Sequence, residues 1–517
     1  MRAPMFACAY SATVLGIEGV CVEVEVDISN GLPYFEVSGL AASSVKEARD
    51  RVRAAIKNSG FSFPAQKITI NLAPADVRKA GSMLDCAIAI GILLASSQIK
   101  IKNEMAGWLF LGELSLEGKL RPIHGILPMI LAAKEQGLVG VVIPYDCKED
   151  AERARLPILR IRTLKECVDC FEKPMDSLPF VCGPNKNGRI HTVPDTYCFS
   201  DVKGQTHVKR AFEVAAAGFH HMLMMGPPGT GKTMMARRFR TILPPLSEEE
   251  SLTVSTIYSA AGMQRERWGQ EMLAPYRAPH FSVTPAAMTG GGTQPRPGEI
   301  SLSHCGVLFL DEAAEFPRSV LEVLRQPMEE GNITIVRSGA KLVFPSRFLL
   351  LSAFNPCPCG YSGFETPSHE CTCTPHQIKQ YRRKISGPLV DRIDVQVEVP
   401  RVPAEQFQAG SSFTSRQMKE RIIEARGRQQ ERYKNTPFRF NAELEGQWIE
   451  RYIPLSPPVK KWVSSLYQAL GISHRSYDKI LKLARTIADL EQCKDIDESH
   501  IAEAIQYRTL EQIYCKK

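Results

Sequence analysis

A phosphate-binding loop is the feature that most constrains the fold of this chain. It consists of Gly226, Pro227, Pro228, Gly229, Thr230, Gly231, Lys232 and Thr233, in the pattern G-x-x-x-x-G-K-T. The apolar run 221–225 precedes the loop and predicts a buried strand, and residues 234–242 after it are compatible with a helix. This order predicts an α/β domain whose glycine-rich turn directs backbone N–H groups onto phosphates.

The types and positions of four polar residues predict how each would act on those phosphates. We expect Lys232 to reach the β- and γ-phosphates and the Thr233 hydroxyl to ligate Mg²⁺. The apolar run Val307–Leu310 predicts a second buried strand, which ends in Asp311 and Glu312. We expect Asp311 to hold Mg²⁺ and Glu312 to polarise the attacking water, a combination typical of a hydrolase.

A third buried run, 348–353, is followed by Asn355. Because the carboxyl ends of neighbouring parallel strands meet at one edge of a sheet, we expect Asn355 to lie beside the γ-phosphate.

Composition is that of an ordinary globular protein, with 44% hydrophobic and 23% charged residues. Lys and Arg exceed Asp and Glu by 64 to 56, a net charge of +8 that permits a polyanionic partner without requiring one. The longest apolar run, 83–99, contains Asp85 and is shorter than the roughly 20 residues of a membrane span. It predicts a buried helix, and we expect no membrane association.

The 517 residues suggest about three domains. Residues 1–172 alternate strand and helix patterns and predict a first α/β domain, and 173–198 are rich in Pro, Gly, Asn and Asp and predict a linker. Residues 199–402 predict a second α/β unit, and residues 403–517 predict an α-helical lid. Helices are expected in the lid at 415–433, 458–470, 476–491 and 498–507.

The phosphate loop, the Asp-Glu strand and Asn355 together resemble an AAA+ ATPase. That resemblance implies that Asn355 is sensor 1, that Asp201–Gln205 flank the adenine, and that Arg392 is an arginine finger. A finger acts on a neighbouring subunit, so the resemblance implies a homohexameric ring with ATP at each interface. An alternative role for Arg392 is a salt bridge with Asp391 or Asp394.

A second arginine, sensor 2, is expected near the helix that begins at 476. Arg475 is our choice and Arg485 the alternative. The catalytic set expected from sequence and resemblance is therefore Glu312, Lys232, Asn355, Arg392 and Arg475.

Further motifs narrow the resemblance and extend it over nearly the whole chain. They are Arg277-Ala-Pro-His280, Gly290-Gly-Gly292, Pro297–His304, Asn355-Pro-Cys-Pro-Cys-Gly360 and Ala484–Asp489. Together they resemble the ComM (YifB) family of magnesium-chelatase-like ATPases. This resemblance implies a bacterial hexameric DNA motor, a helicase that drives branch migration when foreign DNA is integrated during natural transformation. Without this resemblance, the residues indicate only an oligomeric ATPase.

A basic hairpin is the feature of the sequence that favours nucleic acid. Apolar residues alternate over 332–344, and Arg337-Ser-Gly-Ala-Lys341 predicts a turn with two cations near its tip. In AAA+ motors a hairpin just before sensor 1 points into the pore, so Arg337 and Lys341 would line it and track single-stranded, duplex or branched DNA. The alternative is a solvated hairpin end. The basic stretch 415–434 is a second candidate, more typical of a solvated helix face.

Four of the 15 cysteines crowd into residues 357–373. Cys357 and Cys359, then Cys371 and Cys373, form two C-x-C pairs, and four thiolates suit tetrahedral Zn²⁺. The pairs are closer than usual, so His369 or His376 could replace one cysteine. Reduced or redox-labile thiols are the alternative. The odd cysteine number and this crowding favour a reducing cytoplasm over a disulfide framework. The expected cofactors are ATP and Mg²⁺, with Zn²⁺ in this insertion.

The first domain resembles the proteolytic domain of Lon through Asn71–Asp76, Gly112–Gly118 and Leu120–Gly125. Lon requires a serine nucleophile and a lysine base, and the matching positions hold Leu84 and Leu127. Ser82 and Lys134 lie nearby without the required spacing. We therefore predict a Lon-like fold without protease chemistry. For the function of the whole chain we favour a DNA translocase, and the alternatives are a magnesium-chelatase motor subunit and an ATP-dependent protease.

Overall fold

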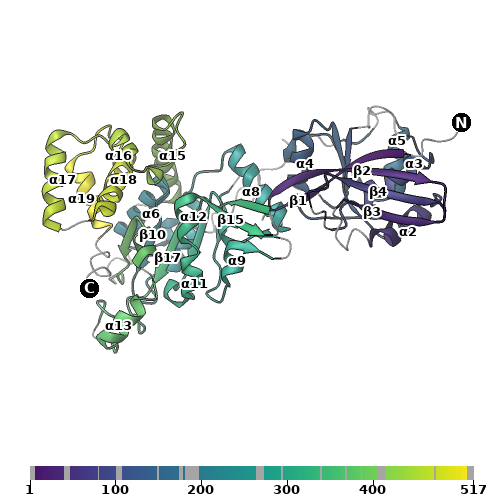
Figure 1. The fold of residues 1–517 in the computed structure, drawn as a ribbon. Coiled ribbons are helices and arrows are strands. Elements are labelled where there is room, and N and C mark those ends of the chain that lie inside the picture. Colours follow the sequence, from purple (N-terminus) through teal and green to yellow (C-terminus); the bar gives the residue numbers. More distant parts are fainter. Residues whose placement is uncertain are drawn as a thin grey trace.

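The computed structural model shows three successive parts: an N-terminal α/β part, a central α/β part and a C-terminal α-helical part (Figure 1). The described residues are 6–39, 47–77, 79, 81–100, 107–147, 151–173, 178–180, 197–263, 273–292, 295–337, 340–366, 369–385, 387–403, 414–470 and 473–508. Among them, no helix combines the length and the apolar character needed to cross a bilayer.

The N-terminal part contains a seven-stranded mixed sheet in the order β3-β4-β2-β1-β5-β8-β9. Alternating apolar residues on the long strands form one buried face, including Val22, Val24 and Val26. Its strands are β1 (Phe6–Leu15), β2 (Glu18–Ser29), β3 (Tyr34–Ser38), β4 (Lys67–Ala73), β5 (Trp108–Phe110), β8 (Gly140–Pro144) and β9 (Ile158–Ile161). A small separate ribbon pairs β6 (Glu113–Leu114) with β7 (Leu120–Arg121).

Helices pack against this sheet, and the apolar run 83–99 forms one of them, which confirms the prediction of a buried helix. The helices are α2 (Ala48–Asn58), α3 (Asp85–Ala95), α4 (Ile126–Glu135), η2 (Ala151–Ala154) and α5 (Leu164–Glu172). Helix α3 is buried along almost its whole length because α2 lies beside it and β1 and β2 lie beneath it.

The central part is built on a parallel sheet in the order β11-β14-β17-β10-β18. All four residues of β10 and β14 are buried, as their continuous apolar runs predict. The strands are β11 (Tyr276–Arg277), β14 (Val307–Leu310), β17 (Leu349–Phe354), β10 (Met222–Met225) and β18 (Val395–Glu398). The three strands predicted from apolar runs agree with the structure within about one residue.

Helices and two short ribbons surround this sheet. The helical segments are η4 (Phe199–Asp201), α6 (Thr206–Gly218), α7 (Lys232–Ile242), α8 (Glu248–Ala261), α9 (Pro285–Thr289), α10 (Glu299–Leu302), η5 (Ala313–Glu315), α11 (Arg318–Glu322), α12 (Arg325–Glu330), α13 (Pro375–Arg382) and α14 (Gly387–Val390). The ribbons pair β12 (Gly290–Gly291) with β13 (Arg296–Pro297), and β15 (Asn332–Arg337) with β16 (Ala340–Pro345).

The C-terminal part is helical, as predicted. Its helices are α15 (Ser415–Arg432), η7 (Asn441–Glu443), α16 (Gln447–Tyr452), α17 (Pro457–Leu470), α18 (His474–Leu490) and α19 (Glu498–Gln506). One continuous apolar cluster contains residues from both these helices and the central sheet, for example Ile422, Leu483 and Met224. The helices are therefore anchored on the central part.

The basic stretch 415–434, which includes helix α15, is solvated on one side, as its sequence predicts, where the side chains of Arg416 and Lys434 are exposed. Other cations of α15 contact the rest of the protein. Arg421 forms an ion pair with buried Glu213 at 2.6 Å, and Arg432 pairs with buried Asp489. Arg426 donates to the Ala216 carbonyl at 2.7 Å. Arg426 and Arg432 are directed inward because α15 packs on α6 and α18, whereas Arg416 and Lys434 remain exposed.

Within the described residues, the N-terminal part contacts the central part at two places. At the first, the N–H of Gly125 donates to the Ser259 carbonyl at 3.0 Å, and Arg153 donates to the Ser251 hydroxyl at 2.6 Å. At the second, the β1–β2 turn packs on the β15–β16 hairpin, where Gly16 lies against Leu342 and Phe344. The predicted linker 173–198 lies largely outside the described residues.

Candidate nucleotide-binding site

The polar residues predicted to surround the phosphates follow three neighbouring strands. The phosphate loop follows β10, Asp311 and Glu312 follow β14, and Asn355 follows β17. Since β14, β17 and β10 are adjacent and parallel, their carboxyl ends meet at one edge of the sheet. The strand order thus brings together three segments of the site that are separated in sequence.

Lys232 lies at the centre of this edge. Its Nζ donates to the carbonyls of Gly226 at 2.6 Å and Pro227 at 2.9 Å, and to Asn355 Oδ1 at 3.2 Å. Burial lowers the pKa of the Lys232 ammonium to about 8, and the carboxylates of Asp311 and Glu312 oppose that shift. A buried cation bound mostly to neutral acceptors fits an anionic ligand such as a polyphosphate.

Gly231 caps the start of α7 with a φ of +86°, a left-handed conformation that suits glycine. This turn directs the first N–H groups of α7 toward the site, where the positive end of the helix dipole favours phosphate.

Two acids complete the site. The Thr233 hydroxyl donates to Asp311 Oδ2 at 2.7 Å, so the two predicted Mg²⁺ ligands are adjacent. An oxygen donor set of hydroxyl and carboxylate suits Mg²⁺, which prefers such ligands together with substrate phosphates. Glu312 is exposed, and its backbone N–H donates to Asp311 Oδ1 at 3.1 Å. Its carboxylate is therefore accessible to water next to the predicted Mg²⁺ ligands.

The two predicted arginines share one carboxylate. Arg392 pairs with Glu329 at 2.7 Å, and Arg475 pairs with the same oxygen of Glu329 at 2.8 Å. Arg475 also pairs with Asp391 at 2.8 Å. The alternative that Arg392 bonds Asp391 or Asp394 differs from the structure, because α12 presents Glu329 to it instead. Sequence reasoning missed Glu329, for which no local signal exists.

Arg485, the alternative to Arg475, has a structural role. It is buried, donates to the carbonyls of Cys493 and Lys494, and pairs with Asp489 at 3.1 Å. Its side chain is therefore committed to the helical part, and Arg475 remains the better candidate for sensor 2.

The basic hairpin forms between β14 and β17, as predicted. Arg337 pairs in register with Ala340, and Lys341 with Val336. Leu342 and Phe344 are buried against the protein, whereas Lys341 and Val336 are exposed. The side chain of Arg337 lies outside the described part of the structure.

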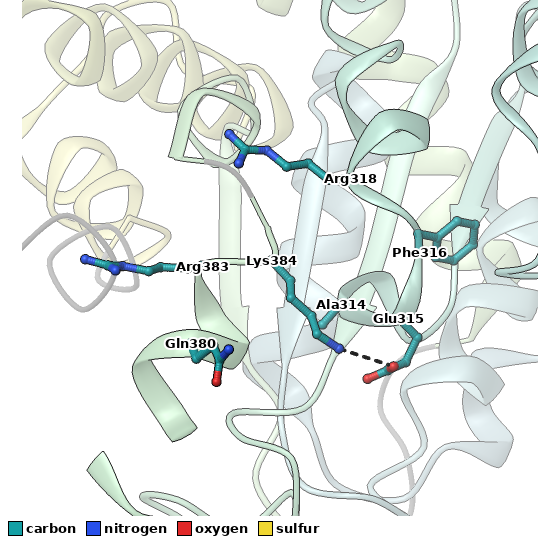
Figure 2. A pocket seen from close by; sticks show the side chains of 7 residues that line it. All are labelled: Ala314, Glu315, Phe316, Arg318, Gln380, Arg383 and Lys384. Atoms are coloured by element: carbon teal, nitrogen blue, oxygen red, sulfur yellow. Dashed lines mark hydrogen bonds and ion pairs between the residues drawn. The ribbon is translucent and has the colours of Figure 1, made fainter. Parts of the chain in front are cut away.

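A shallow basic hollow of about 390 Å³ lies beside the turn that follows Glu312 (Figure 2). Arg318, Arg383 and Lys384 line it, and Lys384 pairs with Glu315 across it at 3.4 Å. None of the residues predicted to bind the nucleotide lines this hollow.

The predicted cysteine set converges. The thiols of Cys357, Cys359, Cys371 and Cys373 lie within 4.8 Å of one another and form a cluster that could hold a metal ion. The alternative ligands are elsewhere: His369 stacks on Tyr361, and exposed His376 lies at the start of α13.

The positions that correspond to the Lon nucleophile and base carry no such chemistry. Leu84 and Leu127 are buried in the core. Ser82 donates to Glu113, and Lys134 donates to the Ala154 carbonyl at 3.0 Å. Ser82 and Lys134 thus have separate partners.

A parallel five-stranded sheet with a phosphate loop, two acids and an asparagine at its carboxyl edge defines a P-loop nucleoside triphosphatase of the AAA+ type. Three family profiles match the chain: "Magnesium chelatase, subunit ChlI" over residues 198–407, "Subunit ChlI of Mg-chelatase" over 24–147, and "Magnesium chelatase, subunit ChlI C-terminal" over 412–508.

Full-length relatives agree with these profiles. The chain is 40% identical to the competence protein ComM of Haemophilus influenzae over 98% of this chain and 97% of that protein. It is 39% identical to the uncharacterized protein YifB of Escherichia coli over 98% of this chain and 97% of that protein. The chain belongs to the ComM-like group of the magnesium-chelatase family of AAA+ ATPases. A weaker similarity, 30% over 188 residues, links it to Lon protease 2 of Bacillus subtilis over 32% of this chain and 33% of that protein.

Proposed function

We propose that this chain is an ATP-driven DNA motor that forms a homohexameric ring and promotes branch migration of recombination intermediates. The DNA involved would include molecules taken up by natural transformation, and the motor would work in the cytoplasm. The observation that carries the proposal is the exposed Lys341 on a hairpin inserted between the Asp311-Glu312 strand and the Asn355 strand.

ATP and Mg²⁺ fit the residues at the carboxyl edge of the central sheet. Residues 226–233 would hold the phosphates, and Thr233 and Asp311 would hold Mg²⁺. The metal, when bound, supplies charge neutralisation on the phosphate oxygens. Glu312 would orient and polarise water, and Asn355, which accepts from Lys232, would position both the lysine and that water.

The hairpin can couple nucleotide state to DNA because both of its ends continue into the site. β15 follows α12, which carries Glu329, and β16 leads into β17 and Asn355. A small shift at the nucleotide can therefore move Lys341 without direct contact. A lysine ring in a pore would follow phosphates without reading bases. The name of the Haemophilus relative, a competence protein, is consistent with a role in DNA uptake.

Association of subunits, which we propose to be six, is supported by the position of Arg392. Its guanidinium bonds to Glu329 and to the Pro388 carbonyl of its own chain and has no contact with the phosphate loop among the described residues. It can assist catalysis only if it is presented to another subunit's nucleotide.

Two alternatives remain distinguishable. A protease is disfavoured because Leu84 and Leu127 occupy the catalytic positions. A magnesium-chelatase motor subunit is favoured by the wording of the family profiles and would hydrolyse ATP without any response to DNA.

The test is steady-state ATP hydrolysis by the full chain without DNA and with single-stranded, duplex and four-way-junction DNA. A DNA motor should be stimulated by at least one of these, and it should convert a labelled junction to products only with ATP. Hydrolysis that no DNA alters, together with an unchanged junction, would contradict the motor and favour the chelatase role.

A further inference from the structure

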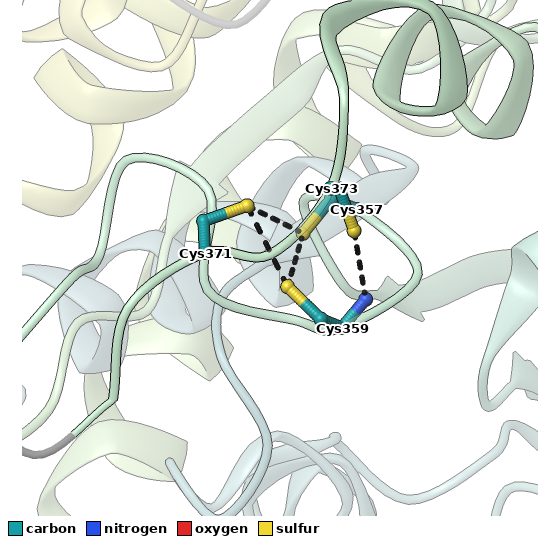
Figure 3. A group of neighbouring side chains, drawn as sticks. All are labelled: Cys357, Cys359, Cys371 and Cys373. Atoms are coloured by element: carbon teal, nitrogen blue, oxygen red, sulfur yellow. Dashed lines mark hydrogen bonds between the residues drawn. The ribbon is translucent and has the colours of Figure 1, made fainter.

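The four-cysteine cluster lies directly beside the nucleotide site. Cys357 and Cys359 follow Asn355 closely in the sequence, and Cys371 and Cys373 precede α13. Figure 3 shows the side chains of these four cysteines next to one another. The Sγ atoms of Cys357 and Cys359 are 3.3 Å apart, those of Cys357 and Cys371 3.8 Å, and those of Cys359 and Cys371 3.5 Å. Two short pairs from either end of one loop thus meet at a single point.

These separations match those of ligands around one metal ion. Four sulfurs at about 2.3 Å from a tetrahedral zinc lie about 3.8 Å from one another. A disulfide would bring two sulfurs to about 2.05 Å, far closer than any pair here. An iron–sulfur cluster would separate the sulfurs more widely, because several metal ions would stand between them. All four thiols lie within 4.8 Å, so one ion fits.

Backbone N–H groups support two of the sulfurs. Cys359 N–H donates to Cys373 Sγ at 3.4 Å, and Ser362 N–H donates to Cys357 Sγ at 3.3 Å. Such donors stabilise negative charge on thiolate ligands and fix their orientation. Four thiols with no acid or histidine among them select a soft metal, for which zinc is the non-redox choice.

We propose that Cys357, Cys359, Cys371 and Cys373 bind one zinc ion, and that this ion is a clamp that holds sensor 1 and the phosphate loop in their working positions. The cysteines are positioning residues, since none of them reaches the site of hydrolysis.

The first cysteine pair, Cys357 and Cys359, belongs to a segment that contacts the phosphate loop. Gly360, the residue after Cys359, has a φ of +89° and lies so close to the loop that a Cβ would stand 2.6 Å from Cδ of Pro228. The same Cβ would stand 3.9 Å from Cγ of Asn355. The Cys357–Gly360 segment is therefore packed on Pro228, and a shift of this segment toward the loop would press on Pro228.

The second cysteine pair, Cys371 and Cys373, is connected through α13 to the segment that carries the proposed arginine finger, Arg392. Thr374, next to Cys373, caps α13 by accepting from Gln377 N–H at 3.3 Å. At the other end of α13, Arg382 donates to the Pro356 carbonyl at 3.0 Å. α13 is followed by α14 and Arg392. Zinc would thus join the segment of sensor 1 to the segment that carries the finger.

Metal content is the first test, and it is independent of any activity. The full chain, purified under reducing conditions without chelator, should contain about one zinc per subunit by elemental analysis. Replacement with cobalt should give the visible absorption of a tetrahedral thiolate site. Absence of metal, or iron in its place, would overturn the zinc assignment.

The coupling is tested with Cys371→Ser/Cys373→Ser and the matched control Cys8→Ser, an exposed cysteine of the N-terminal part. The double variant should lose zinc and its kcat for ATP should fall by about tenfold, while Cys8→Ser keeps both. Circular dichroism checks that the variant is folded. If it is not, zinc removed from the native protein by chelator and then restored should abolish and recover turnover. A folded, zinc-free protein with unchanged kcat would overturn the proposal that zinc acts as a clamp. Neither zinc content nor this kcat requires DNA, so both results are independent of the proposed DNA function.

Discussion

Arg392 lies against Glu329 of its own chain, with Nη2 2.7 Å from Oε1, and Arg475 holds the same carboxylate oxygen. The two arginines that the family resemblance assigns to catalysis are thus held together by an acid on α12. The Arg392 side chain is 13% exposed in this arrangement. For it to act on a neighbour's nucleotide, this ion pair must open when the ring forms.

Replacing Glu329 by Gln should therefore favour the assembled, active state. Because Glu329 is 45% exposed, the pair is worth about 1 kcal/mol or less. We expect ATPase activity at low protein concentration to rise by no more than about fivefold. Glu330→Gln is the matched control, since Glu330 bonds Gln326 instead. A fall in activity with Glu329→Gln alone would show that the pair supports catalysis.

Mixing inactive subunits tests whether Arg392 acts across the interface. Arg392→Ala and Lys232→Ala should each be inactive alone. In equal mixture, a site is complete when an Arg392→Ala subunit has a Lys232→Ala neighbour, so roughly a quarter of the sites should recover. Hydrolysis measured across mixing ratios should peak near equality. Mixed rings that stay inactive would remove the support for action in trans.

Glu312→Gln should retain ATP binding and lose turnover by about a hundredfold, the scale expected for loss of a general base. The amide keeps the size of the side chain but cannot take a proton from water. Fluorescent-nucleotide binding and steady-state hydrolysis measure the two effects separately. Glu315→Gln, three residues on and paired with Lys384, is the control. Near-normal turnover by Glu312→Gln would exclude Glu312 as the base.

Lys341→Ala, and more strongly Arg337→Ala/Lys341→Ala, should weaken DNA binding and branch migration while sparing ATPase activity measured without DNA. The lost contacts would be to phosphates, so binding should weaken equally across sequences and depend less on salt. Anisotropy titrations of a four-way junction over a salt series measure both. Lys57→Ala, an exposed lysine at the end of α2, is the control. Unchanged affinity and salt slope in the double variant would place the DNA contact elsewhere.

Asp85 should make the N-terminal sheet less stable as pH rises from about 4 to about 6. Burial raises the pKa of this carboxyl to about 6, against the opposing pull of Arg51, which pairs with it at 2.9 Å. The folded state therefore holds a proton that the unfolded chain releases near pH 4, and its stabilising effect is lost as pH passes 6. At 1.36 kcal/mol for each unit of pKa shift, the free energy of unfolding should fall by about 3 kcal/mol over this range.

Hydrogen exchange of the N-terminal sheet in wild type and Asp85→Asn measures this effect. The stability difference between the two proteins should follow pH between about 4 and about 6 and level off on either side. A difference independent of pH would mean that Asp85 stays ionised throughout.

The nucleotide site was largely predictable because its signals are local. A buried strand requires a continuous apolar run, and the polar residue that ends the run marks the edge of the sheet. Thr233 and Asp311 could therefore be paired before their 2.7 Å contact was known. The helical C-terminal part followed from periodicity in the same way, with boundaries shifted by about two residues or fewer.

The sequence by itself determined which residues could bind phosphate, metal and water, since those properties belong to residue type and to neighbours along the chain. Only the tertiary structure decided which partners distant residues meet. Glu329 reaches Arg392 and Arg475, Arg426 and Arg432 of α15 turn inward, and Gly16 lies against the β15–β16 hairpin. These contacts join segments far apart in sequence, and they depend on how whole helices and sheets pack, which no local pattern encodes.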